Sequence, residues 1–320
     1  MYLPIFRGRQ YELLALDVEA RHNLFATTLE TNQILPIVDP VNLTTRLKKT
    51  IESFIETEQY IGIIFNSNQL YLGYDLKELI NFIQEIEGYS RYVVPVIHMS
   101  ADYEIVFDEL KNLHYEDKDC IICCLEPEQI SNLNRLGEER QLTMRYILVG
   151  ESRDFTRGLS RKATNLVLCM DRFNKKARNS DYEEQKDEIF SSDHIYFEND
   201  GFGGYSDYSI IGNDANTLGF APRAVAIHIV YMNDKEDNIF YVHHFVSESN
   251  DSIENPAGKF SEALEKLITW KQSYTYYTSA LEEFQKLYNE KRYPGLGVIK
   301  KLSIQQHLET VHHYFQSQRG

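Results

Sequence analysis

The chain has 320 residues, of which 42% are hydrophobic and 25% are charged, which is ordinary usage for a globular protein. A chain of this length buries about three quarters of the surface of its unfolded form, which excludes a disordered, collagen-like or disulfide-scaffold protein. The net charge of −15 disfavours a protein that coats long duplex nucleic acid or an anionic membrane, because its field repels phosphate groups.

Short apolar runs alternate with amphipathic segments along the first 190 residues. The apolar runs predict strands at 2–6, 34–38, 60–65, 92–97, 120–125, 144–149 and 166–170, with an eighth at 208–211. The segments between them predict helices at 11–23, 44–58, 75–86, 101–113, 127–139, 155–162 and 175–190. This alternation predicts an α/β fold, a TIM-barrel-like (β/α)8 barrel. A doubly wound open sheet is the alternative, but the glycine-rich GxGxxG turn expected there does not occur.

The pattern changes after residue 222. Two arms rich in β-branched and aromatic residues flank the polar turn 233–238, which predicts an antiparallel hairpin insertion over about 223–246. Helices are predicted at 259–270, 274–289 and 303–318. We interpret residues 1–270 as a TIM-barrel-like domain that includes the hairpin, and residues 271–320 as a helical C-terminal extension.

The four cysteines are interpreted as reduced core residues. Three of them lie in the apolar run 120–125, where a strand places neighbouring side chains on opposite faces. No apolar run reaches the roughly 18 residues of a membrane helix, and the N-terminal segment acquires charge too early for a signal peptide. We therefore expect a cytoplasmic protein without a membrane partner.

Polar residues follow almost every predicted strand, and in a barrel these positions converge on one mouth. Asp39, His98, Glu126 and Asp171 are of the types that bind a divalent metal ion or act as an acid and base pair, so they are the candidate catalytic residues. The candidates for ligand binding are Arg7, Arg9, Asn66, Glu151 and Arg172. The alternative is a solvated rim with salt bridges, since strands end at the solvent boundary. None of the motifs HExxH, DxDxDG, GxSxG or Walker A occurs.

Two further places attract notice. The loop 201–208 combines glycines, aromatic residues and a carboxylate, which makes Tyr205 and Asp207 candidates for ligand binding; a tight loop before the eighth strand is the alternative. His243 and His244 are neighbours on a predicted strand and point to opposite faces. We interpret His228, on the other arm, as one member of an ordinary cross-strand pair.

Several short motifs resemble the beta protein family of bacteria and phages. They are the opening segment 2–16, the stretch 37–41, Gly204-Tyr-Ser-Asp-Tyr208 and the hairpin arm Ala224-Val-Ala-Ile-His228, spread over roughly residues 1–270. The resemblance implies a TIM-barrel-like fold and an accessory role in anti-phage or mobile-element loci. The resemblance assigns no catalytic residues. Among the positions that match the family, the first choices for mutagenesis are Arg7, Arg9, Asp39 and Asp207.

Three functions remain open from the sequence. The leading hypothesis is a non-catalytic barrel that binds a phage component or regulates a co-encoded protein partner in a bacterial conflict system. The alternative is a metal-dependent phosphoester or nucleotide hydrolase with its site at the strand ends, where Arg7 or Arg9 holds the phosphate. The third is a scaffold that forms a homo-oligomer through the C-terminal helices. Whether the protein is an enzyme is left open.

Overall fold

The computed structural model of the chain describes residues 1–29, 33–67, 73–139, 144–152, 155, 165–213, 222–274 and 276–318. The chain divides into two compact units. The first unit contains Met1–Asp171 and Asp193–Tyr208, and the second contains Arg172–Ser192 and Ser209–Gly320. Each unit is therefore built from two separate stretches of the chain.

The first unit is a barrel of eight parallel strands in the order β1-β2-β3-β4-β5-β6-β7-β9. The strands are β1 (Ile5–Phe6), β2 (Ile37–Val38), β3 (Ile61–Ile64), β4 (Val93–His98), β5 (Ile121–Cys124), β6 (Tyr146–Val149), β7 (Leu166–Cys169) and β9 (Gly204–Ser206). The backbone N–H of Ile5 donates to the carbonyl oxygen of Asp207 at 2.8 Å, and that of Asp39 donates to Phe6 at 2.7 Å. The first strand thus bonds to both the second and the last, and the predicted TIM-barrel-like fold is confirmed.

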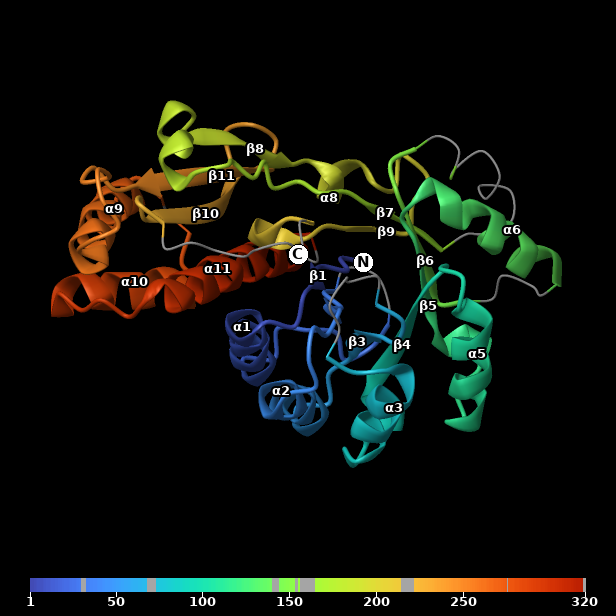
Figure 1. The fold of residues 1–320 in the computed structure, drawn as a ribbon. Helices are drawn as coiled ribbons and strands as arrows, with labels where there is room; N and C mark the ends of the chain where they lie inside the picture. The colour runs from blue at the N-terminus through green and yellow to red at the C-terminus, as the bar shows by residue number, and fades with distance from the viewer. Residues whose placement is uncertain are drawn as a thin grey trace. The chain divides into compact units, whose positions relative to one another are not determined.

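Helices cover the outside of this barrel (Figure 1). The helices of the first unit are α1 (Gln10–Arg21), α2 (Thr45–Glu56), α3 (Leu76–Gln84), α4 (Tyr89–Tyr92), α5 (Tyr103–Asn112), α6 (Ile130–Glu139) and α8 (Asp193–Tyr196), with 3-10 turns η1 (Asp117–Asp119) and η2 (Pro127–Gln129). Local capping sets their starts: Thr44 Oγ1 accepts from the N–H of Leu47 at 3.1 Å, and Asp75 accepts from Glu78 at 2.8 Å. The predicted helix 155–162 lies outside the described residues except for Phe155.

The last strand of the barrel lies earlier in the chain than the predicted strand 208–211. It spans Gly204–Ser206, whereas Ser209–Ile211 forms the 3-10 turn η4. The reason is the close approach of two backbones, because a Cβ built on Gly204 would lie 2.5 Å from the carbonyl oxygen of Met1. Only glycine lets the last strand reach the first at this distance.

Replacing Gly204 by alanine is expected to destabilise the first unit by about 1–3 kcal/mol, because the new methyl group must displace the Met1 backbone. Hydrogen exchange of peptides from β1 and β9 as a function of denaturant measures the effect. Gly73→Ala is the matched control, since a Cβ there meets only the end of the Asn42 side chain, which can rotate away. Equal stability of the two variants would contradict the prediction.

The second unit contains a three-stranded antiparallel sheet in the order β10-β11-β8. Its elements are η3 (Asn179–Glu184), β8 (Asp187–Ser191), η4, β10 (Ala226–Asn233), β11 (Ile239–Val246), α9 (Pro256–Lys271), α10 (Ser279–Glu290) and α11 (Leu296–Ser317). The predicted hairpin is confirmed, and its register places His228 opposite His244. Strand β10 and the three helices share one apolar core, in which Ile229, Leu267, Phe284 and Leu302 are buried.

Two predictions differ from this arrangement. The predicted helix 175–190 is the turn η3 followed by strand β8, because pairing of Asp187–Ser191 with β11 overrides the helical preference of its charged residues. The predicted domain boundary at residue 270 falls inside the second unit. The hairpin belongs with α9, α10 and α11, and Gln306 Nε2 on α11 donates to the carbonyl oxygen of Val230 on β10 at 3.1 Å.

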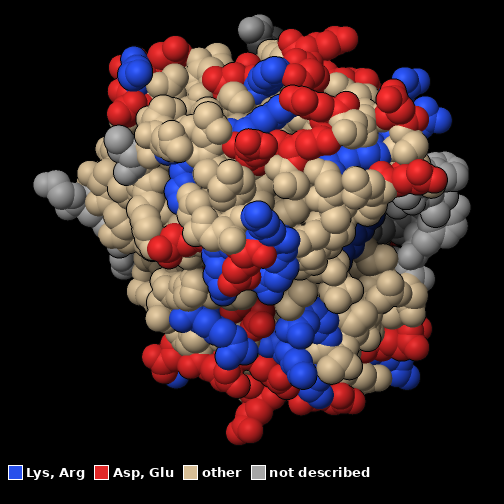
Figure 2. Space-filling view, turned by 90° about the vertical axis from the view of Figure 1, so that its left-hand side faces the viewer, with Lys and Arg blue, Asp and Glu red and all other residues tan. Residues whose placement is uncertain are grey.

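Charged side chains of both signs intermingle on the face shown in Figure 2. The net charge of −15 is therefore accompanied there by scattered Lys and Arg. A face of this kind keeps the protein solvated, and charges of opposite sign lie beside each other on it. Recognition of a charged ligand on this face accordingly depends on local groups of side chains.

Candidate functional site

Arg7 and Asp39 form a buried ion pair where β1 and β2 end. Arg7 Nη1 lies 2.9 Å from Asp39 Oδ2, and the two side chains are 11% and 1% exposed. The guanidinium carbon of Arg7 also lies 5.1 Å from the ring centroid of Tyr208. The structure thus brings two predicted site residues together as partners of each other.

Glu12 fixes the turn that carries the two predicted arginines. Its Oε2 accepts from the backbone N–H of Arg7 at 2.8 Å and from that of Arg9 at 3.4 Å, and the side chain is buried. Arg9 is half-buried and occupies the N-cap position of α1. The Glu12 carboxylate therefore fixes both the start of α1 and the turn that carries Arg7 at the mouth of the barrel.

Asn66 holds the backbone of His98 from both sides. Its Nδ2 donates to the His98 carbonyl at 2.9 Å, and its Oδ1 accepts from the His98 N–H at 2.8 Å. Asn66 also donates to Ser100 and Asp102. The imidazole of His98 is buried, and its Nδ1 has no hydrogen-bond partner among the described residues.

Burial lowers the pKa of His98, and the positive charge of Arg7 adds to this, while Asp39 and Asp102 oppose it. His98 is therefore neutral at pH 7. A buried neutral imidazole beside an Arg–Asp pair can accept a proton, and of the predicted catalytic residues His98 and Asp39 are the two whose charges influence each other here.

Tyr205 and Asp207 lie at the seam between the first and last strands. The hydroxyl of Tyr2 donates to Asp207 Oδ1 at 2.6 Å, and the rings of Tyr2 and Tyr205 stack at 4.8 Å. Burial and then the Asp207 carboxylate raise the pKa of Tyr2 well above its ordinary value. Both residues predicted to bind a ligand thus contribute to closing the barrel.

The remaining predicted residues differ from this cluster in burial or belong to the other unit. Glu126, Glu151 and Asp171 are exposed, and Arg172 belongs to the second unit. Within the described residues, which include Asp39, His98, Glu126 and Asp171, no three His, Cys, Asp or Glu side chains are placed to hold a metal ion. The four-residue metal site predicted from the strand ends is therefore not formed, because Asp39 and His98 are buried while the two other carboxylates turn to solvent.

The cysteines are free and buried, as predicted. Burial raises the pKa of Cys120 to about 12, and it raises the pKa of Cys123 well above its ordinary value. These thiols therefore stay protonated at neutral pH, which makes them core residues rather than nucleophiles.

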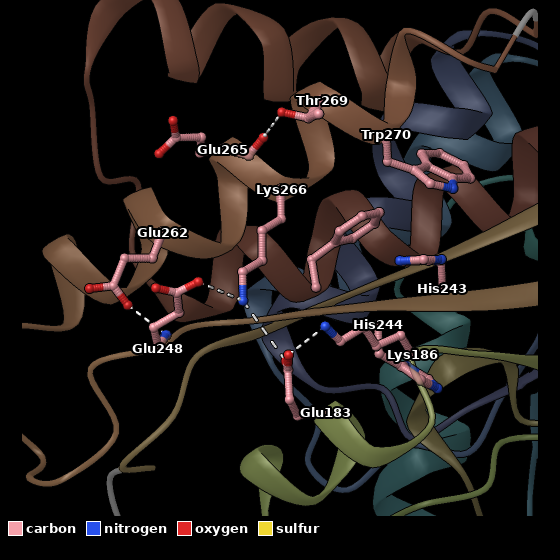
Figure 3. A pocket seen from close by; sticks show the side chains of 11 residues that line it. Glu183, Lys186, His243, His244, Glu248, Glu262, Glu265, Lys266, Thr269 and Trp270 are labelled. Atoms are coloured by element: carbon pink, nitrogen blue, oxygen red, sulfur yellow. Dashed lines mark hydrogen bonds and ion pairs between the residues drawn. The ribbon is translucent and has the colours of Figure 1, made fainter.

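A cavity of about 480 Å³ lies within the second unit (Figure 3). We call it the second-unit cavity, and its lining residues are Glu183, Lys186, His243, His244, Phe245, Glu248, Glu262, Glu265, Lys266, Thr269 and Trp270. They come from η3 and the residues after it, from β11 and the loop that follows, and from α9. Its volume is that of a site for a small molecule or a large side chain.

Lys266 crosses the second-unit cavity and is held by three oxygens. Its Nζ donates to the carbonyl of Val246 at 2.8 Å and lies 3.4 Å from Glu248 and 3.9 Å from Glu183. Figure 3 places Trp270 and His243 at one end of the cavity and Glu248 and Glu262 at the other. The cavity thus has an aromatic end and an acidic end.

Two histidines, His228 and His244, form a hydrogen-bonded pair beside the cavity, and of the two His244 is buried. Nδ1 of His228 and Nδ1 of His244 are 2.8 Å apart, and His244 Nε2 lies 3.1 Å from Glu188 Oε1. Because His244 donates to this carboxylate through Nε2, its neutral Nδ1 accepts the proton of His228. Burial lowers the pKa of His228 to about 3, with a contribution from His244.

This second site could be predicted from the sequence only in part. The cross-strand pair that includes His228 is confirmed by its register with His244, whereas the cavity was not among the predicted sites. The sequence signal that could have indicated this site is the clustering of Glu248, Glu262 and Glu265 near the single tryptophan, Trp270.

Comparison of the chain with protein-family models, with curated proteins and with solved structures finds no match. Among the described residues, none of the helices is both long enough and apolar enough to cross a membrane.

Proposed function

We propose that this chain is a binding protein, in which the barrel of the first unit is a scaffold and the second-unit cavity receives a segment of a protein partner. The observation that carries the proposal is the cavity itself, where aromatic and ionised side chains surround about 480 Å³. The mouth of the barrel supports it, because Arg7 and Asp39 neutralise each other there and Tyr2 holds Asp207.

The biological setting that we propose is a bacterial anti-phage or mobile-element conflict system. The resemblance to the beta protein family supports this setting, and the partner is then a phage protein or a co-encoded protein in the cytoplasm. In this setting the chain acts by holding or sensing its partner. Long duplex nucleic acid is not the partner, because the net charge of −15 repels it.

Deletion of the gene in its natural host is expected to change the plating of at least one phage, and the wild-type gene is expected to restore it. The full chain, tagged and isolated during infection, is expected to carry one partner protein in a stable complex. The double variant Glu248→Lys/Glu265→Lys should lose both effects, because it reverses two charges of the cavity.

The matched control is Glu254→Lys, which changes an exposed glutamate in the loop before α9 that does not line the cavity. It should keep both the complex and the phage phenotype. Unchanged plating on deletion, together with the recovery of no partner, would overturn the proposal.

Hydrolysis at the barrel mouth is the competing function, and one observation favours it: the buried Nδ1 of His98 has no hydrogen-bond partner among the described residues. The variant His98→Gln separates the two functions in the same plating assay. The binding proposal predicts that this variant, once shown to be folded, still protects. A folded variant that no longer protects would assign the function to chemistry at the mouth instead.

A further inference from the structure

We infer that the second-unit cavity recognises a cationic side chain of the partner, an arginine before a lysine; this inference rests on the proposed binding function. It specifies which chemical group of the partner enters the cavity.

The charges of the lining favour a cation. The four glutamates Glu183, Glu248, Glu262 and Glu265 outnumber the two lysines Lys186 and Lys266. Both lysines are already bound, since Lys186 Nζ lies 2.6 Å from Glu183 and Lys266 Nζ contacts Glu183, Glu248 and the Val246 carbonyl. An anion entering the cavity would meet this excess of carboxylates, whereas a cation would reduce it.

Glu262 is held in place as an ionised acceptor. It accepts from the backbone N–H groups of Glu248 at 2.6 Å and Ser249 at 2.9 Å, and also from the Ser249 hydroxyl. The hydrogen bond from the Ser249 hydroxyl lowers the pKa of Glu262. This carboxylate is therefore charged and positioned before any ligand arrives, which reduces the entropy that binding must overcome.

Glu265 supplies a second carboxylate on the same helix. It lies three residues after Glu262 on α9, is exposed, and makes no ion pair among the residues that the structure describes. A planar guanidinium group, whose five N–H donors can contact more than one acceptor, exploits two lining carboxylates better than the compact ammonium group of lysine does.

The aromatic end of the cavity accounts for the rest of an arginine side chain. Phe245 and Trp270 pack at 5.6 Å between ring centroids, and His243 lies 4.4 Å from Phe245. The long apolar stem of an arginine can pack along this wall while its charged head reaches the carboxylates. A bare inorganic cation would leave most of the 480 Å³ unfilled.

Fluorescence of Trp270 tests the inference directly, because it is the single tryptophan of the chain and lines the cavity. The probes are short capped peptides of glycine with one central residue, which is arginine, citrulline, lysine or norleucine. Citrulline matches arginine in shape and lacks its charge. The arginine peptide is expected to change the fluorescence and to bind about tenfold more tightly than the citrulline peptide, since a charge-assisted hydrogen bond is lost in the latter.

Calorimetry of the same mixtures detects binding that leaves Trp270 unperturbed. Glu265→Gln is expected to weaken the arginine peptide several-fold, and Glu254→Gln, outside the cavity, should leave its affinity unchanged. Equal affinity for arginine and citrulline, or no binding by either method, would overturn the inference. Tighter binding of inorganic phosphate than of the arginine peptide would overturn it as well.

Free arginine amide separates the two sources of the same cation. If it binds as tightly as the peptide, the cavity takes a small molecule and the inference about a partner segment is wrong. The inference and the proposed function fail under different results. A partner that binds to the cavity without an arginine contradicts only this inference. If the arginine peptide binds to the cavity but no partner protein is recovered from infected cells, only the proposed function is contradicted.

Discussion

Replacing Arg7 by methionine is expected to destabilise the barrel by about 3–5 kcal/mol, because the buried Asp39 carboxylate loses its guanidinium partner. Methionine keeps much of the apolar stem, so the change isolates the charge. The measurement is denaturant-dependent hydrogen exchange of peptides from β1 and β2, which report on the first unit alone.

A more exposed ion pair in the same unit provides the comparison. Arg46 Nη1 lies 3.4 Å from Asp17, and the arginine side chain is 33% exposed. Arg46→Met should cost about 1 kcal/mol or less, because exposed pairs contribute little. Adding Asp39→Asn to Arg7→Met should recover part of the loss, since it removes the buried charge. Similar losses for Arg7→Met and Arg46→Met would contradict this account of the mouth.

Acidification is expected to destabilise the second unit through His228, whose ordinary pKa of 6.5 burial lowers to about 3. Below pH 6.5 the imidazole takes up a proton in the unfolded chain, whereas in the folded unit it stays neutral until about pH 3. Its contribution to stability is therefore complete above pH 6.5 and falls by about 1.4 kcal/mol per pH unit below it. Burial also lowers the pKa of His244, so this residue acts in the same direction while Glu188 opposes it.

Urea unfolding monitored by Trp270 fluorescence between pH 7 and pH 4 measures this effect, because the single tryptophan lies in the second unit. His228→Gln should reduce the dependence of the free energy of unfolding on pH, because glutamine can still hydrogen-bond to His244 and does not titrate. His22→Gln, which changes a half-exposed histidine of the first unit, should leave it unchanged. An unaltered slope in His228→Gln would assign the acid sensitivity to other groups.

The barrel could be predicted from the sequence because its strands are continuous apolar runs and the helices between them are amphipathic. Two elements could not. The segment 175–190 is rich in charged residues that favour a helix, and only its pairing with β11 makes Asp187–Ser191 a strand. The position of the last strand depends on the contact of Gly204 with Met1, which are two hundred residues apart in the chain.

The candidate site could be predicted only in its composition. The convergence of Arg7, Asp39, Asn66 and His98 on the mouth followed from strand order, but burial and hydrogen bonding decide which of them act as structural partners. The second-unit cavity draws its lining from three separate stretches. Hydrophobic periodicity predicts which residues share a face of a strand or a helix, but it does not predict which two faces pack against each other.

The division of the chain has a consequence for the order of events during synthesis. Residues 172–192, which follow β7, belong to the second unit. The next stretch, 193–208, contains β9 and belongs to the barrel, and all residues from 209 onward belong to the second unit. Every barrel strand is thus synthesised before β11, which is the neighbour of β8 in the sheet order β10-β11-β8 of the described residues. Strand β8 therefore stays unpaired until β11 has been made. Its residue Ile189 is 59% exposed even in the folded protein. Nascent chains stalled after β8 has emerged from the ribosome and before β11 has emerged should accordingly be the forms most prone to aggregate or to recruit a chaperone.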